Sequence, residues 1–208
     1  MFSIDKKPDI ILASQSARRR AILANLGISF KVMVSNADEE LDEGTEPSEY
    51  VEILSMRKAE AVLNELTSDY ASADPLIIAS DTVVVCDGKI LGKPKDKEDA
   101  ARMIGMLSGR KHSVISGIAV IYREEAAVSH EVTEVEFREL TEDEILAYIS
   151  TDEPYDKAGG YGIQDKASVF VRGIHGDYHN VVGLPVFKLF RLLDERFGIG
   201  FFQLTSED

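Results

Sequence analysis

The first stretch of the sequence with residues suited to chemistry is Ser14-Gln15-Ser16-Ala17-Arg18-Arg19-Arg20. It follows a short apolar run and stands where a helix is expected to begin. The free backbone N–H groups and the macrodipole of a helix start attract anions. Helix starts normally carry acidic residues, so consecutive arginines there indicate a bound anion such as a triphosphate. Surface arginines on an amphipathic helix are an equal alternative, and Arg20 is expected to be one. The candidate ligands are Ser14, Ser16, Arg18 and Arg19.

A second stretch places Asp81-Thr82 inside an apolar segment, with Gly92-Lys93-Pro94 about ten residues further on. Burying a bare carboxylate is prohibitively costly, so Asp81 must be hydrogen-bonded, metal-bound or at the exposed end of a strand. Ligands of open α/β sheets gather at such strand ends. A structural acid in a turn is the alternative for Asp81 alone.

A third stretch, from Glu153 to Gln164, sets an acid, a lysine and an amide among glycines that permit close approach to a ligand. Its candidate residues are Asp156, Lys157 and Gln164. The sequence has no hydrolase motif of the Ser/His/Asp or Cys/His type. Its four histidines lack metal-ligand spacing, and we interpret them as surface or structural residues: His112, His130, His175 and His179.

Alternating strand and helix signals predict the elements that hold these residues. Strands are expected at 10–14, 30–34, 76–79 continuing through 82–86, 113–122, 128–137 and 168–171. Helices are expected from Ser16 as N-cap to Gly27, and at 47–66, 98–107, 141–149 and 185–197. An Asp87-Gly88 turn predicts a hairpin, and Thr141 with Glu144 predicts a capping box. The fold class predicted is α/β with a mixed twisted sheet and flanking helices.

Composition excludes several classes of protein. The chain has 208 residues and a net charge of 23 − 37 = −14, which argues against general affinity for nucleic acid or an anionic membrane. The lone Cys86 excludes an internal disulfide. Apolar runs stay below the roughly 18 residues of a membrane span, and the first residues lack a signal-peptide core. We therefore expect a cytoplasmic protein with no nucleic-acid or membrane partner.

Six motifs in this order resemble the Maf family of nucleotide pyrophosphatases. They are Leu12-Ala13-Ser14-x-Ser16-x-Arg18-Arg19, Asp81-Thr82, Gly92-Lys93-Pro94, Ser108-Gly109 with His112, Glu153-Pro154-x-Asp156-Lys157-Ala158-Gly159, and Val181-x-Gly183-Leu184-Pro185. The resemblance covers nearly the whole chain and implies one domain over residues 1–208. The implied fold is the inosine-triphosphate pyrophosphatase-like (Maf/Ham1) fold, with two lobes around a substrate cleft. Ala17 departs from the family's usual proline, which should cost rigidity rather than chemistry.

The resemblance also implies an activity. Thr82 and Gln164 match the branch that hydrolyses dTTP and UTP to the monophosphate and pyrophosphate, whereas Gln and Glu at these positions are typical of the 7-methyl-GTP branch. Specificity is thus assigned to Arg18, Thr82 and Gln164. Two alternatives stay open: a pyrophosphatase for purine or modified nucleotides such as ITP or 7-methyl-GTP, and a non-enzymatic nucleotide-binding regulator of septum formation or cell division.

Hydrolysis at the α-phosphorus needs an activated water and positive charge on the leaving pyrophosphate. By resemblance Asp81 is the proton acceptor, although from the residues alone it could equally hold a metal. Glu40 is the candidate second metal ligand, and hard oxygen ligands predict Mg²⁺ or Mn²⁺. The oligomeric state is left open, a homodimer included. The candidate phosphate clamps are Arg18, Arg19, Lys58 and Lys93.

Overall fold

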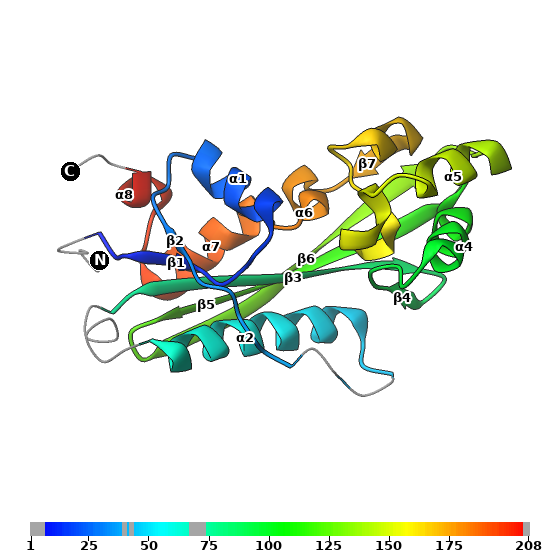
Figure 1. The fold of residues 1–208 in the computed structure, drawn as a ribbon. Coiled ribbons are helices and arrows are strands. Elements are labelled where there is room, and N and C mark those ends of the chain that lie inside the picture. The colour runs from blue at the N-terminus through cyan, green and yellow to red at the C-terminus, as the bar shows by residue number, and fades with distance from the viewer. Residues whose placement is uncertain (1–6, 39–40, 42–43, 67–73, 206–208) are drawn as a thin grey trace. The chain divides into compact units, whose positions relative to one another are not determined.

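The computed structural model describes residues 7–38, 41, 44–66 and 74–205 (Figure 1). The chain divides into two compact units. Unit 1 comprises Met1–Asp81, Ser116–Glu131 and Gly183–Asp208, and unit 2 comprises Thr82–Ile115 and Val132–Val182. The expectation of one domain over residues 1–208 stays a prediction. Glu40 lies outside the described residues.

The strands of the described residues form one seven-stranded sheet. Its order is β2 (Lys31–Val32), β1 (Ile10–Leu12), β3 (Leu76–Cys86), β5 (Lys111–Tyr122), β6 (Glu125–Phe137) and β7 (Val171–His175), with β4 (Lys89–Leu91) paired to β3. Strand β1 is parallel to β2 and β3, while β4 and β7 run antiparallel to their neighbours. The sheet is therefore mixed, as predicted. Three of its strands contribute residues to both units: β3 (Leu76–Cys86), β5 (Lys111–Tyr122) and β6 (Glu125–Phe137).

Unit 1 is a layered α/β unit. Its own elements are β1 (Ile10–Leu12), α1 (Ala17–Asn25), β2 (Lys31–Val32), α2 (Pro47–Glu65), α7 (Val186–Phe197) and α8 (Phe201–Thr205). Helix α2 covers one face of the strands, and α1 and α7 cover the other (Figure 1). All three residues of β1 are consequently buried.

Helix α2 approaches the sheet very closely. A Cβ on Gly117 of β5 would lie 2.2 Å from the carbonyl oxygen of Val51 in α2. Only glycine leaves room for this contact, which brings the next turns of α2 onto β1 and β3. There Ala59 and Val62 pack with Ile11 and Ile77 in one buried cluster. The same packing fixes the part of α2 that carries Lys58.

Unit 2 is built from helices and short turns on its share of the strands. Its own elements are β4 (Lys89–Leu91), α4 (Lys97–Leu107), α5 (Glu142–Ile149), the 3₁₀ helices η1 (Glu153–Asp156), η2 (Ala158–Gly160) and η3 (Lys166–Phe170), β7 (Val171–His175) and α6 (Tyr178–Val182). Their apolar faces enclose a core in which Phe137, Tyr161 and Phe170 stack edge to face.

Most predicted elements and end signals are confirmed. Ser16 caps α1, Thr141 and Glu144 form the capping box of α5, and the β3–β4 turn has positive φ at Asp87 and Gly88. The strand predicted at 30–34 is only two residues long. No helix in the described ranges is both long enough and apolar enough to cross a membrane.

The strand predicted at 168–171 is wrong for most of its length. Residues Lys166–Phe170 form η3, and β7 begins at Val171. The reason is a contact that the local sequence does not contain. The carboxylate of Glu153 accepts hydrogen bonds from the backbone N–H groups of Lys166 (3.1 Å) and Ala167 (3.2 Å). These bonds satisfy the donors at the start of a helical turn and so favour it over extended chain.

Candidate active site

The turn between β1 and α1 is closed by its own serines. The Ser16 hydroxyl accepts a hydrogen bond from the backbone N–H of Arg19 at 3.4 Å, which is the predicted N-cap. Ser14 Oγ accepts from the backbone N–H of Ser16 and from Nη1 of Arg19, both at 3.2 Å. The two hydroxyls therefore stabilise the turn and hold Arg19 beside it. The backbone N–H groups at the start of α1 are the feature of this turn that attracts anions.

The carbonyl oxygen of Gly183 joins this turn to β3. It accepts from Nε of Arg19 at 2.7 Å and from the hydroxyl of Ser80, the residue before Asp81, at 3.0 Å. Gly183 has a φ of 119°, a backbone conformation that glycine adopts most readily. Arg19, predicted as a phosphate clamp, thus uses part of its guanidinium to fix the backbone of unit 1.

Asp81 meets the requirement set by its apolar surroundings through an ion pair. Its Oδ1 lies 2.5 Å from Nζ of Lys58, which projects from α2. The two side chains are only 15% and 14% exposed, so this charge pair is weakly screened by solvent. Lys58, predicted as a phosphate clamp, is paired with this carboxylate.

The arginines beside the turn differ in exposure. Arg18 and Arg19 are half-buried and Arg20 is exposed, as expected for adjacent helix positions that face different ways. Among the described residues, no three His, Cys, Asp or Glu side chains gather to form a metal site. A cation that takes most of its ligands from a bound triphosphate still fits, because Mg²⁺ is commonly held by one or two carboxylates plus substrate phosphates.

Two of the motifs assigned to unit 2 are in direct contact. The backbone N–H of Gly159 donates to the carbonyl of Gly92 at 2.9 Å. Gly159 has a φ of 67°, and a Cβ there would lie 2.8 Å from the side chain of Val84 in β3. This close approach explains the glycine and sets Lys93, which is exposed, next to the η2 turn. Thr82 is half-buried at the start of the unit 2 part of β3.

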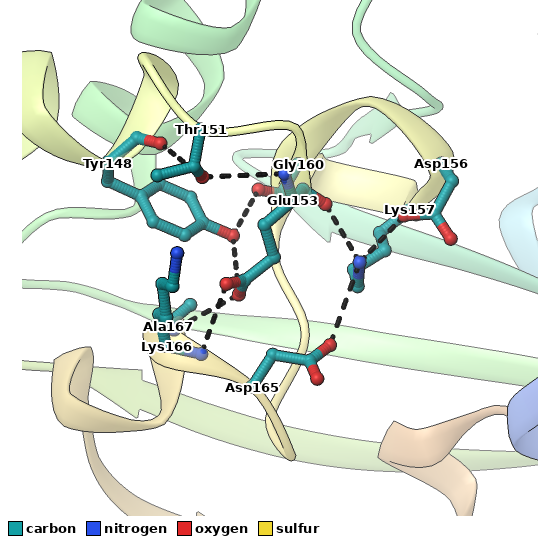
Figure 2. A network of polar contacts seen from close by, with 9 residues as sticks. All are labelled: Tyr148, Thr151, Glu153, Asp156, Lys157, Gly160, Asp165, Lys166 and Ala167. Atoms are coloured by element: carbon teal, nitrogen blue, oxygen red, sulfur yellow. Dashed lines mark hydrogen bonds and ion pairs between the residues drawn. The ribbon is translucent and has the colours of Figure 1, made fainter.

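Asp156 and Lys157 form part of a polar network (Figure 2). The ammonium of Lys157 lies 2.6 Å from Oδ1 of Asp156, 2.8 Å from the carbonyl oxygen of Glu153 and 3.6 Å from Oδ2 of Asp165. Lys157 is only 8% exposed. Gln164 is exposed in the turn that precedes Asp165. The structure therefore brings Asp156 and Lys157 together and surrounds the lysine with protein oxygens.

His112 and Tyr161 form a buried polar pair in the same unit. Nε2 of His112 lies 2.7 Å from the hydroxyl of Tyr161, and burial lowers the pKa of the histidine to about 4. Burial also raises the pKa of Tyr161 above its ordinary value. Both side chains are therefore neutral near pH 7. The interpretation of His112 as a structural histidine is confirmed by its burial and its partner.

Sequence reasoning missed several residues around the candidate site. The Gly183 carbonyl accepts hydrogen bonds from both Arg19 and Ser80, and the only signal in the sequence was that Gly183 belongs to the Val181-x-Gly183-Leu184-Pro185 motif. Ser80, Tyr148 and Asp165 gave no signal, because their partners lie far away in sequence or belong to the backbone. These residues position others, which a search for reactive side chains does not detect.

The mixed sheet and the hydroxyl-rich turn between β1 and α1 define an α/β protein suited to binding an anionic ligand at the end of β1, while the Asp81–Lys58 pair lies in the middle of β3. Within that class the chain belongs to the Maf family, since the family model described as Maf-like protein matches residues 9–196.

Similar proteins extend over almost the same length. The dTTP/UTP pyrophosphatase of Moorella thermoacetica is 47% identical over 186 residues, which is 88% of this chain and 93% of that protein. The dTTP/UTP pyrophosphatase of Alkaliphilus metalliredigens is 47% identical over 192 residues, or 91% and 97% of the two chains. Among solved structures, the Staphylococcus aureus Ham1 protein matches 62% of this chain and 71% of its own with a TM-score of 0.44 and 14% identity.

Proposed function

We propose that this protein is a nucleoside triphosphate pyrophosphatase that hydrolyses dTTP and UTP to the monophosphate and pyrophosphate. The observation that carries the proposal is the pair of relatives with this name that are 47% identical over about nine-tenths of the chain. The ion pair between Asp81 and Lys58 adds chemical support, because it holds the Asp81 carboxylate 2.5 Å from the Lys58 ammonium in a largely enclosed setting.

The proposed reaction follows from the roles that the residues can fill. The oxygen of a water molecule bonds to the α-phosphorus while the bond from that phosphorus to the bridging oxygen breaks, so that pyrophosphate leaves. Asp81 accepts the proton of the water at Oδ2, because Oδ1 is held by Lys58. Lys58 thereby keeps the carboxylate oriented. A fixed orientation raises the reaction rate, because the proton transfer from water to Asp81 depends on the geometry of the two groups.

Positive charge must compensate the departing pyrophosphate. Arg18 and Lys93 are the proposed phosphate ligands, since both carry exposed or half-exposed cations. The backbone N–H groups at the start of α1, shaped by Ser14 and Ser16, are proposed to hold the phosphate chain. Arg19 is proposed to orient this turn through Gly183 and, as expected from the sequence, to contact the phosphates.

A divalent cation, Mg²⁺ or Mn²⁺, is part of the proposal. Oxygens of the triphosphate would hold it, with Glu40 as the second acid proposed from the sequence. In the alternative role, in which Asp81 binds the metal and is not the proton acceptor, Oδ2 of Asp81 would be a further ligand. When bound, such an ion neutralises phosphate charge and lowers the pKa of the attacking water. Removal of the ion with EDTA should abolish turnover, and adding Mg²⁺ or Mn²⁺ back should restore it.

The base is proposed to be read by Thr82 and Gln164, with Arg18 as a third specificity residue. A glutamine amide offers a donor and an acceptor to the O4 and N3–H edge of uracil or thymine. The proposal also includes a cytoplasmic location, a link to septum formation and a homodimer as further expectations.

The test is a nucleotide panel of dTTP, UTP, ITP and 7-methyl-GTP with Mg²⁺ or Mn²⁺, with the products separated and identified. We expect dTTP and UTP to be cleaved fastest, to the monophosphate and pyrophosphate. Faster cleavage of ITP or 7-methyl-GTP would replace the pyrimidine assignment by the alternative enzyme class. No cleavage of any nucleotide would favour the non-enzymatic regulator.

A further inference from the structure

The turn that carries Gln164 is a short irregular segment, and something must hold it if its amide is to read a base. The segment from Tyr161 to Asp165, called here the Gln164 turn, joins η2 to η3. The backbone N–H of Asp165 closes it by donating to the carbonyl of Gly162 at 3.2 Å. Gln164 and Asp165 are exposed, so packing of their own side chains does not fix the turn.

Lys157 contacts the Gln164 turn directly. Its ammonium has three N–H donors, and three protein oxygens surround it: the Glu153 carbonyl, Asp156 Oδ1 and, at 3.6 Å, Asp165 Oδ2 in the turn itself (Figure 2). The lysine is 8% exposed. A buried cation whose donors already face protein oxygens would have to give up a partner to bind a phosphate.

Gly162 shows how tightly the Gln164 turn is seated on this lysine. A Cβ at Gly162 would lie 2.7 Å from Cε of Lys157 and 2.7 Å from Oδ2 of Asp165. The backbone of the turn therefore rests directly on the lysine stem. Any change in the position of the stem or of Asp165 is passed to the turn.

Glu153 holds the chain just after the turn. Its carboxylate accepts from the backbone N–H groups of Lys166 and Ala167 at 3.1 and 3.2 Å, and lies 3.1 Å from the hydroxyl of Tyr148 (Figure 2). At the other end, Tyr161 is held by His112 at 2.7 Å. The Gln164 turn is thus anchored at both ends and in the middle by side chains of one unit.

We propose that Lys157 and Asp165, with Glu153, form a positioning network that fixes the Gln164 turn and so sets the base preference, and that Lys157 is not a phosphate ligand. This inference rests on the proposed function, in which Gln164 contacts the base. Lys157 acts through the turn and touches neither the base nor the reacting atoms.

The main test variant is Asp165→Asn, which keeps the side-chain volume and removes the ion pair with Lys157. Its side chain is 44% exposed, so the fold should persist. We measure the ratio of kcat/KM for UTP to that for ITP, and the inhibition constant of inorganic tripolyphosphate, which has the phosphates but no base. A fall of roughly tenfold in the ratio is expected, because misplacement of a group by about 1 Å can cost up to about a hundredfold.

Three further variants make the test specific. Asp165→Glu keeps a carboxylate and should retain most of the ratio. Lys157→Met should lower the ratio as Asp165→Asn does, with the inhibition constant of tripolyphosphate within about twofold of the wild type, whereas loss of a charged phosphate contact would weaken it by roughly tenfold or more. Asp152→Asn is the matched control, because this acid is exposed and forms no side-chain cap on η1. It should leave every readout unchanged.

A double-mutant cycle with Gln164→Ala shows whether the network acts through Gln164. We expect Asp165→Asn to change the ratio in the wild type and to add nothing in the Gln164→Ala background. An unchanged ratio in folded Asp165→Asn, additive effects in the cycle, or tenfold weaker tripolyphosphate inhibition in Lys157→Met would each overturn the inference. If Lys157→Met does not fold, the cycle alone decides. Absence of UTP cleavage by the wild type would instead overturn the proposed function itself.

Discussion

Stability of unit 2 should depend on pH through the buried His112. Its pKa is lowered to about 4 by burial, against an ordinary value of 6.5, and its side chain is 4% exposed. The folded state therefore binds fewer protons than the unfolded state between these two values. The stabilisation is fully present above pH 6.5 and is lost as the pH falls toward 4. The shift of 6.5 − 4 corresponds to about 3 kcal/mol in full, of which about 2 kcal/mol is lost by pH 5.

The assay is urea unfolding of the wild type and of His112→Gln at a series of pH values from 7.5 to 5. Glutamine cannot take up a proton but can keep a hydrogen bond to Tyr161. Other groups titrate in this range and are common to both proteins, so the difference in slope isolates His112. His175→Gln, which removes an exposed histidine, is the control and should keep the wild-type slope. Equal pH dependence in His112→Gln and the wild type would refute the reasoning.

Three other outcomes are expected. Arg18→Ala and Lys93→Ala should weaken binding of dTTP by roughly tenfold or more, the cost of a charged contact, with little change for dTMP and in thermal stability; equal losses for dTTP and dTMP would remove these residues from the outer phosphates. Gly117→Ala should lower the free energy of unfolding in urea by about 3 kcal/mol or more, because its Cβ would lie 2.2 Å from a backbone oxygen of α2. Gly105→Ala, with open space around its Cβ in α4, should raise that free energy by up to about 1 kcal/mol. Similar effects of the two substitutions would contradict the close packing of Gly117 on α2. Thr82→Gln with Gln164→Glu should lower the dTTP-to-7-methyl-GTP ratio of kcat/KM by roughly ten- to a hundredfold, and an unchanged ratio in a folded, active variant would place base selection elsewhere.

Much of the fold could be predicted because its signals are local. Ser16, Gly27 and the Thr141–Glu144 capping box bound helices by hydrogen bonds or backbone conformations within a few residues. The apolar runs in 10–14 and 76–79 predicted the buried strands β1 and β3 for the same reason. The η3 helix could not be predicted, because its first donors are satisfied by Glu153, which lies 13 and 14 residues away.

For the candidate site, the sequence indicated which polar residues needed a hydrogen-bond or ion-pair partner. It did not indicate which residues would be those partners. The apolar neighbours of Asp81 required a compensating group, and the structure supplies Lys58, 23 residues away on α2. Lys157 was predicted to bind substrate because it stands among glycines that permit close approach to a ligand, yet its environment depends on Asp165 and on a backbone carbonyl. Such contacts arise only from the packing of separate elements, so residue type and spacing do not encode them visibly.

The central claim is that Asp81 drives hydrolysis of dTTP and UTP at the α-phosphorus. Its most direct test is turnover of dTTP by the wild type and by Asp81→Asn under one metal condition, with the products identified and folding checked by thermal unfolding. The amide keeps the volume of the side chain and loses its basicity. We predict dTMP and pyrophosphate from the wild type, and a rate at least about 10²- to 10⁴-fold lower for the folded variant. A folded Asp81→Asn protein within a few-fold of wild-type turnover would contradict the account.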